Sequence, residues 1–426
     1  MSRIVVEDSG SKIENAAHIA KDVVRTPPEN FQNELPSNVN VHYRVRILEA
    51  LAGKWRLLPV FVALLIIWGF FASQNPAFLG ARNLSNLAIQ IVVTSIIALG
   101  LVLLLIIKEI DLSVAATSAV CGAVVAKLSV MYNLNLPLAV ITGIGLGVGI
   151  GLVQGWVVTK FGAPSFIVTL GVSLALQGVL LQILPQDALI SLVGHPVSFV
   201  ANTYLTDIFS YTILSVIILI VGFMRWQSHV LAKREGLKSV FGSHVVLPTA
   251  FISTFGIIIL LVLNSYRGFP TALALLTGLL LLFHFVTTQT SFGTYLYGIG
   301  GNPEATRRAG IPVNRIRLIT FTLAGALSAV GGIVASARVL GVTPESADPT
   351  IMLEAIAAAV IGGASLFGGR GSVWAALLGA LVIGSISNGL YLMEASTPVR
   401  LQIQGAILVI AITVDALIAK DSKARH

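Results

Sequence analysis

Charged residues are scarce in this chain. Asp, Glu, Lys and Arg make up 11% of the 426 residues, and hydrophobic residues make up 55%. Soluble domains carry about 25% charged residues, so this composition indicates a membrane protein. The net charge of +8 is spread between apolar runs rather than gathered into a patch. This distribution argues against nucleic-acid binding and fits basic residues that set orientation in a membrane.

Cysteine and the common catalytic motifs are almost entirely missing. Cys121 is the single cysteine, which excludes an intrachain disulfide and a metal cage built on cysteines. The sequence has no G-x-x-x-x-G-K-[ST] phosphate loop, no H-E-x-x-H zinc motif and no G-x-S-x-G nucleophile elbow. We therefore expect a protein that is not an enzyme and that holds no cofactor or metal. Any energy that drives it must come from elsewhere.

Long apolar runs are abundant. About 20 apolar residues cross a bilayer as a helix. The chain has twelve such candidates, at 56–73, 86–107, 112–132, 136–159, 165–185, 208–223, 246–264, 269–287, 316–338, 353–368, 372–392 and 401–418. The sixth and tenth are the short ones. The predicted fold is an all-α polytopic membrane protein with a transmembrane domain over 56–418, a polar N-terminal region over 1–55 and a tail over 419–426.

The basic residues predict the orientation. If the N-terminus lies inside, 22 of the 27 Lys and Arg residues fall on the cytoplasmic side and 5 fall outside or near the outer ends. Cytoplasmic loops carry such an excess, so both termini and the polar loop 288–315 are predicted to face the cytoplasm. The first apolar run starts too deep in the chain for a cleavable signal peptide.

A weak internal repeat appears when the chain is shifted by 234 positions. Gln154, Pro164 and Gly171 then fall on Asn388, Pro398 and Gly405. The matched spans lie an odd number of spans apart, so the two halves would have opposite orientations in the membrane. Such inverted repeats are typical of transporters. The alternative is chance, because Gly, Ala and Leu recur in every apolar helix.

Gly147, Gly151 and Gly155 follow one another at intervals of four in the fourth apolar run. This spacing puts them on one ridge of a helix, where they allow a neighbouring backbone to approach closely. The ridge therefore predicts a helix-packing surface.

Four polar side chains in the apolar runs or at their ends are candidate functional residues. Gln154 and Asn388 either make hydrogen bonds between helices or line the path of a substrate. Asp111 is expected to cap the third span, although with Lys108 and Glu109 it could form a gate or an ion relay. Glu354 is expected to cap the tenth span, and the alternative is that it lines an access path.

Residues 302–310 form a short, fully capped helix in the sequence pattern. Asn302 suits the N-cap and Pro303 the first helical position. The rest of the pattern is Glu304 at the positive helix end, Arg307 and Arg308 at the negative end, and Gly310 as a left-handed stop. Two turns are marginal in water, so this helix must dock on something. We expect it to couple the chain to a separate motor, with Ala305 at mid-helix. An ordinary connector packed on its own spans is the alternative.

Several stretches resemble the permease subunits of bacterial monosaccharide ABC importers, in the ribose and xylose branch. They are GIGGNPEATRRAGI (298–311), EAIAAAVIGGASLFGGRGSV (354–373), NGL (388–390) and APSFIVTLG (163–171), and the likeness covers most of 56–418. EIDLSV (109–114), the hairpin with the basic loop 225–239, and NSYRGFPT (264–271) are most similar to xylose-type permeases. Lys108, Ala115 and Arg308-Ala309 depart from the residues usual in the family.

The resemblance implies a permease of the bacterial inner membrane that translocates xylose or a related monosaccharide. It implies an ABC ATP-binding subunit that binds the ATP, a periplasmic or lipid-anchored sugar-binding protein, and a second permease chain, identical or a sister. An ion-coupled secondary sugar transporter is the alternative, based on the inverted repeat and on Lys108, Glu109 and Asp111. Sugar selectivity is expected in the binding protein, because the sequence shows no cluster of aromatic and carboxylate residues.

Overall fold

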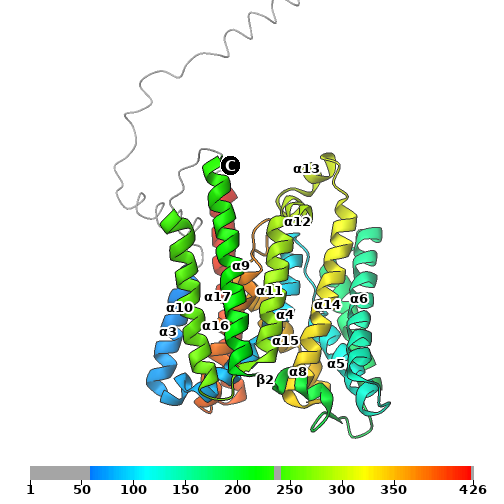
Figure 1. Cartoon of the computed structure of the whole chain (residues 1–426). Coiled ribbons are helices and arrows are strands. Elements are labelled where there is room, and N and C mark those ends of the chain that lie inside the picture. Colours follow the sequence, from blue (N-terminus) through cyan, green and yellow to red (C-terminus); the bar gives the residue numbers. More distant parts are fainter. Residues whose placement is uncertain (1–57, 235–240, 424–426) are drawn as a thin grey trace, which may run out of the picture. The chain divides into compact units, whose positions relative to one another are not determined.

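The computed structural model describes residues 58–234 and 241–423, and fifteen α-helices dominate these residues (Figure 1). The helices are α3 (Leu58–Gln74), α4 (Ala81–Ile106), α5 (Val114–Val130), α6 (Leu136–Phe161), α7 (Ser165–Ile183), α8 (Phe199–Asn202), α9 (Asp207–Arg234), α10 (Leu247–Asn264), α11 (Thr271–Gln289), α12 (Ser291–Gly301), α13 (Pro303–Arg308), α14 (Val313–Val339), α15 (Pro349–Ile361), α16 (Trp374–Leu392) and α17 (Thr397–Lys423). The predicted N-terminal region 1–55 and the last residues of the predicted tail lie outside the described residues.

Short elements connect the helices. Two antiparallel pairs of strands are β1 (Ile190–Ser191) with β4 (Gly341–Val342) and β2 (Tyr204–Leu205) with β3 (Phe269–Pro270). Single turns of 3-10 helix are η2 (Pro76–Leu79), η3 (Pro196–Ser198) and η5 (Pro344–Ala347), and η4 (Gly242–Val246) is a π-helical turn.

A helix covers all or part of each of the twelve predicted runs, and the all-α polytopic prediction is confirmed. Nine helices in the described part are long and apolar enough to cross a membrane, and α3 and α5 are shorter apolar helices. The run at 208–223, expected to be short, lies in the 28-residue helix α9. The run at 353–368 is not one helix, because α15 has 13 residues and ends at Ile361.

Two irregular segments interrupt the bundle, residues 107–113 after α4 and residues 362–373 after α15. The second contains Gly363, Gly368 and Gly369, whose φ angles of 106°, 77° and 71° favour glycine. This glycine-rich backbone cannot continue a helix, which explains why the predicted tenth span is broken.

The helices on either side of these segments form two halves with matching contacts. In the half α4–α7, α5 packs against α6 and α7; in the half α14–α17, α15 packs against α16 and α17. The first helix of each half packs against the other half: α14 packs against α5 and α6, and α4 packs against α15 and α16. α4 ends at the end of the bundle where α14 begins, so the two run in opposite directions (Figure 1). This arrangement is what an inverted repeat predicts.

The glycine ridge of α6 packs against α14, as predicted. A Cβ on Gly151 would overlap the carbonyl oxygen of Phe321, and a Cβ on Gly325 would overlap that of Gly147. Close backbone approach of this kind holds helices together where lipid supplies no hydrophobic driving force.

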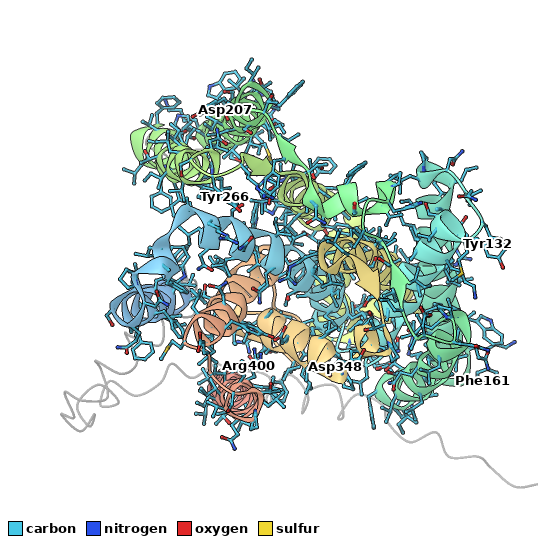
Figure 2. All side chains as sticks on the ribbon, turned by 90° about the horizontal axis from the view of Figure 1, so that it is seen from below. Tyr132, Phe161, Asp207, Tyr266, Asp348 and Arg400 are labelled. Carbon is cyan, nitrogen blue, oxygen red and sulfur yellow. The ribbon has the colours of Figure 1, made fainter. Side chains whose placement is uncertain are left out.

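The two ends of the bundle differ. The helix α13 lies at one end, called here the α13 end, and β2 and α8 lie at the other, called here the strand end (Figure 1). Viewed from the strand end, the α9–α10 pair, marked by Asp207, lies at the periphery, and α17 lies at the edge of the bundle beside Arg400 (Figure 2). The helix α4 is the most buried of the long apolar helices, with 89% of its apolar window inside the bundle.

Candidate functional site

A cavity of about 1560 Å³ lies between α4, α5, α14, α15, α16 and α17 and reaches the strand end, where Asp348 and Arg400 are labelled in Figure 2. Polar and charged side chains supply much of its wall. They include Asn83, Asn86, Gln90, Thr94, Ser118, Ser336, Arg338, Glu345, Asp348, Glu354, Ser387, Asn388, Arg400 and Gln404. A polar hollow inside an apolar bundle can hold water and a hydrophilic solute. At its mouth, hydrogen bonding to the Thr343 side chain lowers the pKa of Glu345, which keeps that carboxylate charged.

One hydrogen-bonded group on the cavity wall joins three helices. Gln404 of α17 donates from Nε2 to Oε1 of Glu354 in α15 (2.7 Å) and to Oγ of Ser387 in α16 (3.1 Å). Beside it, Asn388 and Asn83 of α4 form a reciprocal amide pair, with donor–acceptor distances of 2.7 and 3.0 Å. Glu354 and Asn388 are among the residues predicted from the sequence, whereas Gln404 and Ser387 are not.

The prediction that Glu354 caps a helix is wrong. The helix α15 begins at Pro349, and its N-cap is Asp348, whose carboxylate accepts a 2.8 Å hydrogen bond from the amide of Thr350. Glu354 therefore lies in the second turn, and its side chain lines the cavity. The Asp-Pro dipeptide at 348–349 is an N-cap signal that could have placed this helix start correctly.

The structure separates the two amides that the repeat had paired. Asn388 lines the cavity, whereas Gln154 is 1% exposed and does not contribute to the cavity wall. Gln154 instead donates from Nε2 to Oγ of Ser113 across 2.6 Å. Gln154 thus makes a hydrogen bond between α6 and the start of α5.

The residues Lys108, Glu109 and Asp111 do not form one cluster. Lys108 Nζ donates to the carbonyl oxygen of Gly301 (3.3 Å), and Glu109 lies 3.2 Å from Arg317 Nε of α14. Asp111 accepts from the amide and the hydroxyl of Ser113, at 2.7 and 2.6 Å. The N-cap residue of α5 is Ser113, so Asp111 fixes the turn that leads into α5 and is not its N-cap. Because Lys108, Glu109 and Asp111 each bind a different partner, they do not form an ion relay.

The two irregular segments meet at the α13 end. The amide of Gly369 donates to the carbonyl oxygen of Ile106 (2.9 Å), and the hydroxyl of Tyr297 in α12 donates to the carbonyl oxygen of Gly371 (3.0 Å). Gly300, near the end of α12, lies directly against Ile106 and Gly369. These contacts join α4, α12 and the segment 362–373.

Matching helices of the two halves hold the irregular segments in place. In the first half, Ser165 and Thr169 of α7 accept hydrogen bonds from the amides of Ile110 and Leu112. In the second half, a carboxylate oxygen of Asp415 in α17 accepts from the amide of Leu366 (3.0 Å) and the hydroxyl of Ser365 (3.3 Å). Asp415 is not among the residues predicted from the sequence, although a carboxylate inside an apolar run is a signal of a functional or structural role.

The capped helix predicted at 302–310 is present as α13. Oδ1 of Asn302 accepts from the amides of Glu304 (3.1 Å) and Ala305 (3.0 Å), and Gly310 has a φ of 83°. Pro303 occupies the first turn, Arg307 and Arg308 the last, and Arg307 pairs with Glu304 at 2.7 Å.

Only one face of α13 is attached to the rest of the bundle. Thr306 is 7% exposed and lies near Gly298 of α12, whereas Glu304, Ala305, Arg307 and Arg308 are exposed. The helix thus presents a free surface at the α13 end.

The comparisons with known proteins define the class of this chain. Residues 83–412 match the permease family described as "Branched-chain amino acid transport system / permease component". The chain belongs to this family and is a multi-pass permease of the inner membrane, not an enzyme.

The chain is similar to permeases for two pentoses. It is 38% identical over 363 residues to the xylose transport system permease protein of Escherichia coli (strain K12), covering 84% of this chain and 92% of that protein. The xylose permease of Haemophilus influenzae is 36% identical over 358 residues, with coverages of 83% and 94%. The ribose import permease protein of Escherichia coli (strain K12) is 31% identical over 354 residues, with coverages of 83% and 92%. No solved structure matches the chain.

Proposed function

We propose that this chain is the membrane-spanning permease subunit of an ATP-driven importer for xylose or a related monosaccharide. The observation that carries the proposal is the similarity to xylose permeases over 84% of the chain and 92% of the Escherichia coli relative. The polar cavity supports it, because a sugar loses its hydrogen bonds with water on entering a membrane and needs substitutes along the way.

The proposed partners act at opposite ends of the bundle. An ATP-binding subunit docks on the exposed face of α13 and binds the ATP, so the permease needs no cofactor of its own. A periplasmic or lipid-anchored binding protein delivers the sugar to the cavity at the strand end. A second permease chain, identical or a sister, completes the membrane part.

The distribution of basic side chains supports an orientation with the α13 end and both termini in the cytoplasm. The basic residues toward the α13 end are Lys108, Lys160, Arg225, Lys233, Arg234, Arg307, Arg308, Arg315, Arg317 and Arg370, whereas Arg82, Lys127, Arg267, Arg338 and Arg400 lie toward the strand end. The cavity then opens to the outside, where the binding protein arrives.

The proposed transport step uses the contacts around α12. ATP binding and hydrolysis move α13, and α12 moves with it because only Asn302 separates the two helices. Since Gly300 contacts both Ile106 and Gly369, a shift of α12 displaces the end of α4 and the irregular segment 362–373. This chain therefore binds, releases and gates the sugar without covalent chemistry.

Uptake by reconstituted vesicles tests the proposal. We expect labelled xylose to accumulate only when the permease, its ATP-binding subunit, the binding protein and hydrolysable ATP are all present. A non-hydrolysable ATP analogue serves as the control. Gradient-driven sugar uptake into vesicles that contain only this chain would overturn the importer assignment in favour of a secondary transporter.

A further inference from the structure

Glu354 is the carboxylate that most needs an explanation, since it sits half-buried on the wall of the cavity, in the second turn of α15. A carboxylate within an apolar bundle is costly and is tolerated where it faces a water-filled cavity and has partners. Gln404 donates to its Oε1, and Ser387 is close enough to hydrogen-bond to it. Arg338, on the same cavity wall, supplies a nearby positive charge.

The group retains unused hydrogen-bonding capacity. An ionised carboxylate can accept about four hydrogen bonds, whereas Gln404 and Ser387 account for two. Asn388, adjacent to Ser387 in sequence, donates one of its two N–H bonds to Asn83. The Glu354 carboxylate can therefore accept further hydrogen bonds, and the second N–H of Asn388 can donate one, on the same part of the cavity wall.

Such a set fits a neutral polyhydroxy compound. Each sugar hydroxyl can donate and accept one or more hydrogen bonds, so a carboxylate beside an amide can bind neighbouring hydroxyl groups. The negative charge of Glu354 disfavours anionic sugars such as phosphorylated or carboxylated ones. A cavity of about 1560 Å³ does not enclose a monosaccharide tightly, and weak binding suits a site that must release its substrate.

We propose that Glu354, Gln404, Ser387 and Asn388 form a weak binding station for neutral sugars inside the permease. The station rests on the proposed sugar-import function and adds to it: part of the substrate selection occurs in the membrane subunit, after the binding protein has released the sugar. This departs from the expectation that selectivity lies in the binding protein alone. The local sequence around each residue could not reveal the station, because three helices contribute to it.

The test uses the reconstituted importer with xylose and with a monodeoxy xylose that the same binding protein delivers. The informative variants are Glu354→Gln, Glu354→Leu and Gln404→Leu. Gln402→Leu is the matched control, because Gln402 is exposed on α17 and does not line the cavity. We expect Glu354→Leu and Gln404→Leu to lower the maximal uptake of xylose about tenfold or more, as the loss of a hydrogen bond to a charged group predicts. Gln402→Leu should transport like the wild type.

The ratio of xylose uptake to deoxy-xylose uptake distinguishes a loss of sugar recognition from a loss of helix packing. The wild type should transport xylose faster than its deoxy analogue, and Glu354→Gln should reduce this preference. If uptake of both sugars falls by the same factor in every variant, or if Glu354→Leu and Gln404→Leu match the wild type, the station does not exist. Co-purification with the ATP-binding subunit identifies a variant that fails to assemble. If a leucine variant fails in this way, the sugar preference of Glu354→Gln, which preserves side-chain shape, decides whether the station exists. ATP-dependent uptake by the wild type is measured in the same experiment, so failure of the import function is seen separately.

Discussion

The amide of Gly369 donates a 2.9 Å hydrogen bond to the carbonyl oxygen of Ile106 and thereby joins the two halves of the bundle. Ile106 is the last residue of α4, and Gly369 lies in the irregular segment that follows α15. Gly300 packs against both, two residues before the N-cap of α13. The helices α12 and α4 and the second irregular segment therefore share one contact point, directly before α13 in the chain.

A methyl group at Gly300 should disrupt this contact point. A Cβ there would overlap the Ile106 carbonyl oxygen and crowd the backbone of Gly369, and backbone atoms cannot turn away as a flexible side chain can. We expect Gly300→Ala to abolish most ATP-driven uptake and to destabilise the protein by about 1–3 kcal/mol, seen as a lower melting temperature in detergent.

The neighbouring residue provides the control for that experiment. A Cβ on Gly301 would meet no atom within 4 Å, so Gly301→Ala should leave uptake and melting temperature near the wild-type values. Equal behaviour of the two variants would show that close packing at Gly300 is unimportant for transport.

The contact between Glu109 and Arg317 fixes the first irregular segment to α14. The charged atoms are 3.2 Å apart and the side chains are 10% and 26% exposed, although Arg317 Nε is not aligned for a hydrogen bond. Removing one member leaves the other charge poorly solvated, so we expect Glu109→Gln and Arg317→Met each to destabilise the protein by about 1–3 kcal/mol. Melting temperatures of the two single variants and the double variant measure the coupling. Strictly additive shifts would mean that the ion pair contributes nothing.

The sequence predicted the local features and missed the distant partners. The caps of α13 come from residues within one short segment, so Asn302 and Gly310 could be assigned directly. The hydrogen bond between Glu354 and Gln404 joins positions 50 residues apart, and no periodicity indicates which helix faces which. Gln154 was grouped with Asn388 because the repeat matched them, yet the two halves place these amides in different surroundings. Glu354 was misassigned because the true helix start, at Asp348-Pro349, lies one turn earlier.

Asp415 offers a test of how the second irregular segment is held. Its carboxylate accepts from the amide of Leu366 and the hydroxyl of Ser365. Asp415→Asn keeps an acceptor oxygen, whereas Asp415→Leu leaves the Leu366 amide without this partner, at a cost of about 1–3 kcal/mol. We expect Asp415→Leu to lose most ATP-driven uptake and Asp415→Asn to retain a substantial part of it. If the two variants lose uptake equally, the negative charge matters and the hydrogen bonds to the loop do not.

Ala305 tests the proposed docking surface on α13. It is exposed, and its amide is already bonded to Asn302 at the third helical position. Glutamate is favoured at that position and complements the positive helix end, so Ala305→Glu should leave α13 intact. In a buried interface with the ATP-binding subunit, the unpaired charge should weaken binding by about 2–5 kcal/mol. On a free surface the same change should cost about 0.5 kcal/mol or less.

The control for Ala305→Glu places the same charge at the same end of the bundle. Gln289 is exposed at the last position of α11, so Gln289→Glu adds one negative charge without touching α13. Co-purification with the ATP-binding subunit and ATP hydrolysis stimulated by the binding protein are measured for both variants. We expect Ala305→Glu to lose both properties and Gln289→Glu to keep them. Because the substitution preserves the helix, a loss confined to Ala305→Glu can be assigned to the interface, and wild-type values for Ala305→Glu would mean that α13 is only a connector.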